Sequence, residues 1–101
     1  MITNDYVVRV NHQAMMQLAE HVAFLSNVDE NAAERLRRKL LEKFRSLEDN
    51  PYRCPVYDTE YTTEKYRKLN IDRYQILYSI NENAKVVSIK YVWDTRSENS
   101  L

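Results

Sequence analysis

Glycine is absent from this sequence, so every turn that needs a positive φ angle must use a residue with a side chain. Asparagine and aspartate accept that conformation at the least cost among the remaining residue types. Asn70, Asn81 and Asn83 lie beside or between segments that alternate like strands. We therefore expect these three asparagines to form the tight turns.

Cysteine is nearly absent as well, because Cys54 is the one cysteine of the chain. It cannot form an internal disulfide, and it has no cysteine or histidine neighbours at the spacing of zinc ligands. We expect a half-buried thiol with no chemical role. The sequence predicts neither a metal site nor a cofactor.

Net charge and long apolar runs are also missing. The 15 basic and 15 acidic residues balance, so contact with nucleic acid would need a local patch rather than a field over the whole molecule. No apolar run approaches the roughly 20 residues that cross a bilayer. The first residues lack the basic and apolar parts of an export signal. We expect a cytoplasmic protein without a membrane role.

The length and composition of the chain are those of one small domain. With 101 residues, of which 44% are hydrophobic, the chain has the size and composition of a globular protein with one core. We expect a single domain over residues 1–101, with a frayed tail at residues 97–101.

Two helices are predicted in the first half of the chain. Asn11 is the expected N-cap of a helix over residues 12–26, and Asp29 that of a second helix over residues 30–47. Pro51 disfavours the helical conformation at Asn50, which ends the second helix there. The apolar residues at helical spacing, expected to face the core, are Met15, Leu18, Ala19, Val22 and Leu25, then Ala33, Leu36, Leu40, Phe44 and Leu47.

Strands are predicted at residues 5–10, 66–71, 73–81 and 85–93, where bulky residues alternate with polar ones. The positions expected to face the core are Val8 and Val10, with Tyr6 as a further candidate, then Leu69, Ile71, Tyr74, Ile76, Tyr78, Ile80, Val87, Ile89, Tyr91 and Trp93. The short connections between the last three strands allow only antiparallel hairpins. We predict an α+β fold of order β-α-α-β-β-β, with an antiparallel sheet packed against a helical hairpin.

The charged side chains of this sheet could carry chemistry. Strand alternation places Lys68, Asn70 and Gln75 on the face opposite the core, with Arg73 and Arg96 at the rim. Grouped cations can hold a phosphate and stabilise the charge that develops during attack on it. A solvated face of mixed charge is the alternative, and pairing of Asp94 with Arg73 or Arg96 would favour it.

For the histidines and for the basic residues of the second helix, a role in catalysis or RNA binding is not the favoured interpretation. The residues His12 and His21 lie on opposite sides of their helix, so a role as general base is unfavoured. A solvated helix face explains the basic residues of the second helix better than RNA binding does, and pairing of Glu34 with Arg38 absorbs part of their charge. These basic residues are Arg35, Arg37, Arg38, Lys39, Lys43 and Arg45.

The loop over residues 51–64 is aromatic and polar, and loops of this length in small domains are more often functional than neutral. Its carboxylates are Asp58, Glu60 and Glu64. A solvated loop charge is the favoured interpretation of each, and a role for one of them as a base is the alternative. We predict partner-binding side chains in this loop and on the sheet, namely Tyr57, Tyr61, Asn70, Gln75 and Trp93.

A family resemblance follows from the order of these segments. The segment Tyr66-Arg67-Lys68-Leu69, the pair Arg73-Tyr74 leading into Ile76-Leu77-Tyr78, an Asn-rich turn, a β-branched strand and the closing Arg96 resemble the RelE/ParE superfamily of toxins from type II toxin-antitoxin modules. An amino-terminal strand and a helical hairpin upstream fit as well. The resemblance covers roughly residues 5–96.

The resemblance implies a toxin that a cognate antitoxin protein neutralises. One branch of the superfamily cleaves messenger RNA on the ribosome, and Lys68 and Arg96 match the first lysine and the last arginine of its catalytic set. Asn70 and Gln75 replace a lysine and an arginine of that set, and no tyrosine matching its carboxy-terminal one precedes Leu101.

The replacement of that arginine by Gln75 removes a charged, bidentate phosphate ligand. This loss argues against efficient cleavage by Lys68, Arg73 and Arg96. The other branch inhibits DNA gyrase by binding, and the altered residues favour this kind of target. Cleavage of messenger RNA, and a degenerate toxin that only binds its antitoxin, stay open as alternatives.

Overall fold

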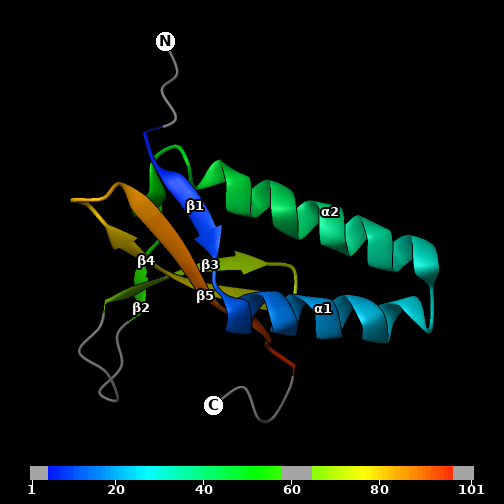
Figure 1. Cartoon of the computed structure of the whole chain (residues 1–101). Helices are drawn as coiled ribbons and strands as arrows, with labels where there is room; N and C mark the ends of the chain where they lie inside the picture. The colour runs from blue at the N-terminus through cyan, green and yellow to red at the C-terminus, as the bar shows by residue number, and fades with distance from the viewer. Residues whose placement is uncertain (1–4, 58–64, 97–101) are drawn as a thin grey trace.

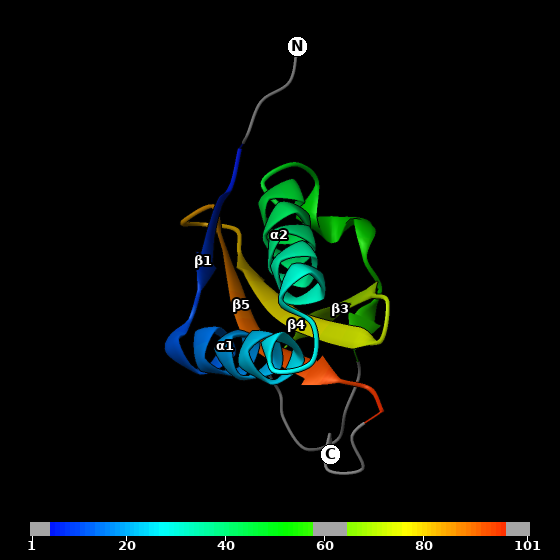
Figure 2. The same ribbon diagram turned by 90° about the vertical axis from the view of Figure 1, so that its right-hand side faces the viewer.

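The protein is described by a computed structural model over residues 5–57 and 65–96. The elements in chain order are β1 (Val7–Val10), α1 (His12–Ser26), α2 (Glu30–Ser46), a 3-10 turn (Pro51–Arg53), β2 (Val56–Tyr57), β3 (Tyr66–Ile71), β4 (Tyr74–Asn81) and β5 (Val86–Asp94). Helices α1 and α2 form an antiparallel hairpin on one face of a single sheet (Figures 1 and 2). The predicted α+β fold is confirmed.

The sheet has five strands in the order β1-β5-β4-β3-β2. Strands β2 to β5 pair antiparallel, whereas β1 pairs parallel with β5, Val7 opposite Val86. The sheet is therefore mixed rather than wholly antiparallel, because the chain between β1 and β5 is long enough for a crossover. Strand β2 lies in the segment predicted as a loop, and Asp58, Glu60, Tyr61 and Glu64 of that segment lie outside the described residues.

Both helices begin at their predicted caps. The Asn11 carboxamide oxygen accepts from the Ala14 N–H at 3.0 Å, and the Asp29 carboxylate accepts from the N–H groups of Asn31 and Ala32 at 3.0 and 3.1 Å. The five inward positions predicted after Asp29 are all buried. Among the described residues, neither helix combines the length and apolar composition needed to cross a bilayer.

The buried face of α1 differs from the predicted one. Ala14 and Leu18 are buried, and Val22 and Leu25 pack against the core, but Met15 and Ala19 are exposed. Helix α1 has apolar or small residues on nearly every side, so periodicity does not select one face. The assignment of Met15 and Ala19 to the core was wrong.

A β-bulge divides β4 and β5 into two registers. Leu77 pairs with Tyr91, but the next residue, Tyr78, pairs with Ile89, so Lys90 is an extra residue in β5. One inserted residue reverses the alternation beyond it. Val92 is therefore fully buried under the helices, and the prediction that Tyr91 and Trp93 face the core was wrong.

The residues with positive φ are also not the predicted asparagines. Within the described ranges, Asn50, Asp72 and Lys85 have φ angles of 53°, 53° and 56°. Two of the three are Asn or Asp, as expected without glycine. Asn70 and Asn81 are strand residues instead, and Asn83 lies in the β4–β5 turn without a positive φ.

Candidate functional site

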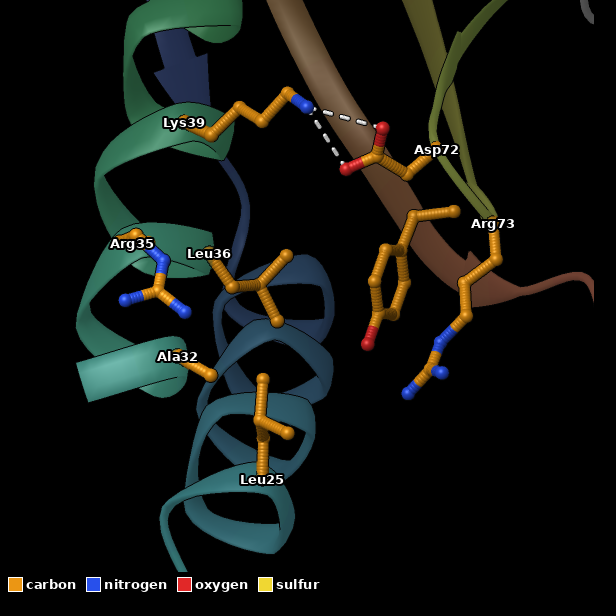
Figure 3. A pocket seen from close by; sticks show the side chains of 8 residues that line it. Leu25, Ala32, Arg35, Leu36, Lys39, Asp72 and Arg73 are labelled. Carbon is orange, nitrogen blue, oxygen red and sulfur yellow. Dashed lines mark hydrogen bonds and ion pairs between the residues drawn. The ribbon is translucent and has the colours of Figure 1, made fainter. Parts of the chain in front are cut away.

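A groove lies between the helical hairpin and the turn from β3 to β4. It encloses about 400 Å³, and we call it the hairpin groove; its lining residues are Leu25, Ala32, Arg35, Leu36, Lys39, Asp72, Arg73 and Tyr74. Figure 3 shows Lys39 reaching from α2 to Asp72, with Arg73 on the same side of the groove as Asp72. The Lys39 Nζ lies 3.0 and 2.9 Å from the two Asp72 carboxylate oxygens.

Asp94 holds the two arginines predicted at the rim. Its carboxylate lies 3.5 Å from Arg73 Nε and 3.8 Å from Arg96 Nε. The Arg73 guanidinium also lies 5.4 Å from the centre of the Tyr74 ring, on the side of the helices. The predicted pairing of Asp94 is confirmed for both arginines, and it offsets charge that a phosphate site would need.

Lys68 lies on the other face of the sheet. It pairs in register with Leu77, and Asn70 pairs with Gln75, so strand alternation places Lys68, Asn70 and Gln75 together on the face away from the helices, as predicted. Within the residues that the structure describes, no contact joins Lys68 to Arg73 or Arg96. The catalytic roles of these three cations stay predictions.

This open sheet face also carries a row of aromatic rings. The Tyr91 and Trp93 rings are stacked with centres 5.3 Å apart, and the Tyr66 ring meets Tyr91 edge-on at 6.1 Å. The Lys68 Nζ lies 5.9 Å from the centre of the Tyr57 ring. Trp93 and Tyr57 were predicted as binding residues. Tyr91 was missed because alternation without the bulge places it in the core, and Tyr66 was not singled out although it alternates with Lys68.

Several apolar side chains on α1 and just after its end are exposed. Phe24 and Val28 are 70% and 76% exposed, and Met15 and Met16 are about half exposed. His21, one turn before Phe24, lies 3.1 Å from the Val92 carbonyl and 5.1 Å from the Tyr74 ring. These contacts give His21 a packing role, while the exposed side chains of Phe24 and Val28 are available to a partner.

The basic residues of α2 lie on its exposed side. Glu34 lies 2.8 Å from Arg37 and 3.6 Å from Arg38. The hydrogen bond from Arg37 is the main cause that lowers the pKa of Glu34 below its ordinary value. These contacts support the solvated helix face.

A second carboxylate cluster surrounds Glu82 in the β4–β5 turn. Glu82 accepts hydrogen bonds from the Tyr6 and Tyr52 hydroxyls at 2.7 and 2.6 Å, and it pairs with the Lys85 ammonium. The Lys85 hydrogen bond, followed by those from Tyr52 and Tyr6, lowers the pKa of Glu82 to about 2. The cluster ties the turn to β1 and to the 3-10 turn. Across the described ranges, no three His, Cys, Asp or Glu side chains form a group suited to a metal ion.

Comparison with known proteins gives one family and two solved folds. The family described as ParE toxin of type II toxin-antitoxin system, parDE, matches residues 8–98. The structure is similar to the chromosomal ParDE toxin-antitoxin system from P. aeruginosa, with a TM-score of 0.72 and 11% identity, over 89% of this chain and 96% of that one. It is also similar to the archaeal RelE-RelB complex from Pyrococcus horikoshii OT3, with a TM-score of 0.61 and 20% identity, over 90% of this chain and 96% of that one. No curated protein matches the sequence.

Proposed function

Because the chain belongs to the ParE toxin family of type II toxin-antitoxin systems, we propose that a cognate antitoxin neutralises it and that it stops growth by binding a protein target such as DNA gyrase. Cleavage of messenger RNA is the alternative that this proposal rejects. The proposal also places the protein in the cytoplasm, where antitoxin and target would meet it.

One observation carries the choice of target. A ribonuclease that works through cations must aim several of them at one phosphate. Here Arg73 and Arg96 share the Asp94 carboxylate, and Lys68 lies on the open sheet face. This arrangement supports inhibition by binding, because binding does not need the three cations to converge.

Exposed apolar side chains near the end of α1 and in the turn after it support an antitoxin partner. Exposed Phe24 and Val28 would be covered by an apolar segment of the antitoxin, in the manner of a helix that packs its apolar side against a partner. Strands β1 and β2 are the two edges of the sheet, and an edge offers unpaired backbone groups to an added strand. The two similar solved structures are described as a ParDE system and a RelE-RelB complex.

The hairpin groove supports an acidic contact in the same complex. Arg35 and Arg73 line it together with the Lys39–Asp72 pair, so the lining residues carry a formal charge of +2 over an apolar floor of Leu25 and Leu36. A carboxylate beside an apolar side chain of the antitoxin would fit there.

Controlled expression with and without the protein encoded by the neighbouring gene tests the proposal. We expect growth arrest that the neighbour relieves, no new RNA ends, and loss of supercoiling by purified gyrase. RNA cuts that disappear in Lys68→Ala and Arg96→Ala would establish the ribonuclease instead. Absence of growth arrest at any expression level would make the protein a degenerate toxin and would overturn the proposal.

The antitoxin surface can be tested separately. Phe24→Asp places a charge among the exposed apolar side chains near the end of α1, and we expect it to weaken antitoxin binding by roughly tenfold or more, as for a central interface residue. The thermal midpoint should stay near that of the wild type because Phe24 is 70% exposed. Lys43→Asp on the exposed side of α2 is the matched control, and an equal loss in both variants would place the antitoxin elsewhere.

A further inference from the structure

A second pocket lies on the side of the sheet that β2 and β3 form. It encloses about 220 Å³, and we call it the β2–β3 pocket; its lining residues are Tyr52, Val56, Lys65, Tyr66, Arg67 and Ile80. None of these residues lines the hairpin groove, and none of their side chains has a part in the contacts proposed above. The β2–β3 pocket is therefore a separate candidate site.

Arg67 is held in a fixed position at this pocket. Its Nη1 donates to the backbone carbonyls of Tyr52 and Cys54 at 3.1 and 2.6 Å, and its guanidinium lies 5.1 Å from the centre of the Tyr52 ring. Among the residues that the structure describes, its Nε and Nη2 form no hydrogen bond. These two nitrogens are parallel donors, so one edge of the guanidinium is available to an oxyanion.

The pocket is positively charged. Lys65 and Arg67 line it, no lining residue is acidic, and within the described ranges neither cation forms an ion pair. Glu82 accepts a hydrogen bond from the Tyr52 hydroxyl, but its charge is paired with Lys85. A partly buried cation such as Arg67 is stabilised by an opposite charge, which a ligand can supply here.

Apolar surface lies beside the two cations. Val56 pairs in register with Arg67, so both side chains are on the same face of the sheet. Val56 is 51% exposed and Tyr52 44% exposed, and Ile80 is partly buried against the core. A ligand whose charged end meets Arg67 can therefore place an apolar body on Val56 and on the Tyr52 ring.

We propose that the β2–β3 pocket binds a small organic carboxylate with a compact apolar body. The carboxylate accepts two hydrogen bonds from Nε and Nη2 of Arg67 and pairs with Lys65, while the apolar body covers Val56 and the Tyr52 ring. A carboxylate fits the planar pair of donors with both of its oxygens. Inorganic phosphate would satisfy the cations but would leave the apolar side chains in water.

Benzoate is a suitable probe because it joins a carboxylate to a flat apolar ring. Titration of the ¹⁵N-labelled full-length protein with sodium benzoate should shift the Nε–H signal of Arg67 and the amide signal of Val56 until both saturate. Benzamide, which is neutral, and inorganic phosphate at the same ionic strength should each bind about tenfold more weakly. Equal affinity for either compound, no shift with benzoate, or shifts confined to other residues would overturn the proposal.

Variants of the pocket separate its two parts. Arg67→Lys keeps the charge but removes the paired donors, so it should weaken benzoate binding about tenfold. Val56→Asp places a carboxylate in the pocket at a half-exposed position, and repulsion should weaken binding at least as much. Arg38→Lys and Val28→Asp, at exposed positions outside the pocket, are the matched controls and should leave the affinity unchanged.

Circular dichroism shows whether each variant folds. Arg67→Lys also loses hydrogen bonds to the backbone, so Val56→Asp decides the question if Arg67→Lys unfolds. Unchanged affinity in Val56→Asp, or an equal loss in the controls, would make the assignment to this pocket wrong.

The outcome is independent of the proposed function, because the purified protein is tested without antitoxin or target. A ligand that binds only the folded state stabilises it, so benzoate should raise the thermal midpoint of the wild type and not that of Val56→Asp. An equal rise in both proteins would contradict binding at the β2–β3 pocket while leaving the antitoxin and gyrase proposals untouched.

Discussion

The hydroxyl of Tyr78 donates a 2.6 Å hydrogen bond to the backbone carbonyl of Pro51. The bond is buried, and it joins the centre of the sheet to the segment that leaves the helical hairpin. Burial raises the pKa of Tyr78, so this phenol stays protonated and remains a donor. The bond thus fixes where the chain turns from α2 toward β2.

Removal of this hydroxyl should destabilise the fold. In Tyr78→Phe the buried Pro51 carbonyl loses its donor, and an unsatisfied buried acceptor costs about 1–3 kcal/mol. Urea unfolding followed by circular dichroism measures the change. Tyr52→Phe removes a hydrogen bond of the same length at an exposed site, where water replaces it, so it should cost less. Equal losses would refute the importance of burial here.

Acid should loosen the Glu82 cluster. The pKa of Glu82 is lowered from 4.5 to about 2 in the folded protein, so its ionised form stabilises the fold above its ordinary pKa. This contribution is lost as the pH falls from about 4.5 through about 2. Unfolding midpoints measured across that window should fall less steeply in Glu82→Gln than in the wild type. If the unfolding midpoints of the two proteins fall equally steeply with pH, Glu82 does not stabilise the fold in this way.

Asn50 should be replaceable by glycine but not by alanine. Its φ and ψ angles of 53° and 65° lie in the left-handed region, where a Cβ atom costs roughly 1–2 kcal/mol unless a short polar side chain relieves it. Asn50→Ala should therefore lower the free energy of unfolding by about 1 kcal/mol. Asn50→Gly should stay within about 0.5 kcal/mol of the wild type, because relief of strain offsets the added freedom of the unfolded chain.

Truncation of a buried side chain of the hairpin should destabilise the protein far more than truncation of an exposed one. Leu40 is fully buried, and Leu40→Ala should cost about 2–5 kcal/mol through lost burial and the cavity left behind. Phe24→Ala removes a larger side chain but should change stability by no more than about 0.5 kcal/mol, since the ring is mostly in solvent. Calorimetric unfolding of both variants compares them. A large loss of stability in Phe24→Ala would mean that the Phe24 ring already packs against another part of the protein.

Local signals in the sequence were enough for most of the fold. Asn11 and Asp29 mark the helix starts because a cap depends only on its neighbours. The face of α1 could not be predicted, since Ala14 and Met15 differ too little in polarity to orient an apolar helix. The bulge at Lys90 carries no glycine to announce it, and its effect on Tyr91 and Trp93 comes from pairing with a distant strand.

Strand alternation also predicted part of the candidate site. Lys68, Asn70 and Gln75 were placed correctly on one face because β3 and the start of β4 alternate regularly. Arg73, which was predicted only at the rim, lies in the turn before β4, where alternation does not apply and where it pairs with Asp94 as expected.

The parallel pairing of β1 with β5 has a consequence for synthesis of the protein. Val10 cannot meet Ile89 until the last strand has left the ribosome, so the sheet stays incomplete while the rest of the chain is already outside. During that interval the apolar side of α2 lacks its permanent cover. A chaperone, or a partner already present beside the ribosome, would meet this protein first in a form that the mature molecule never shows.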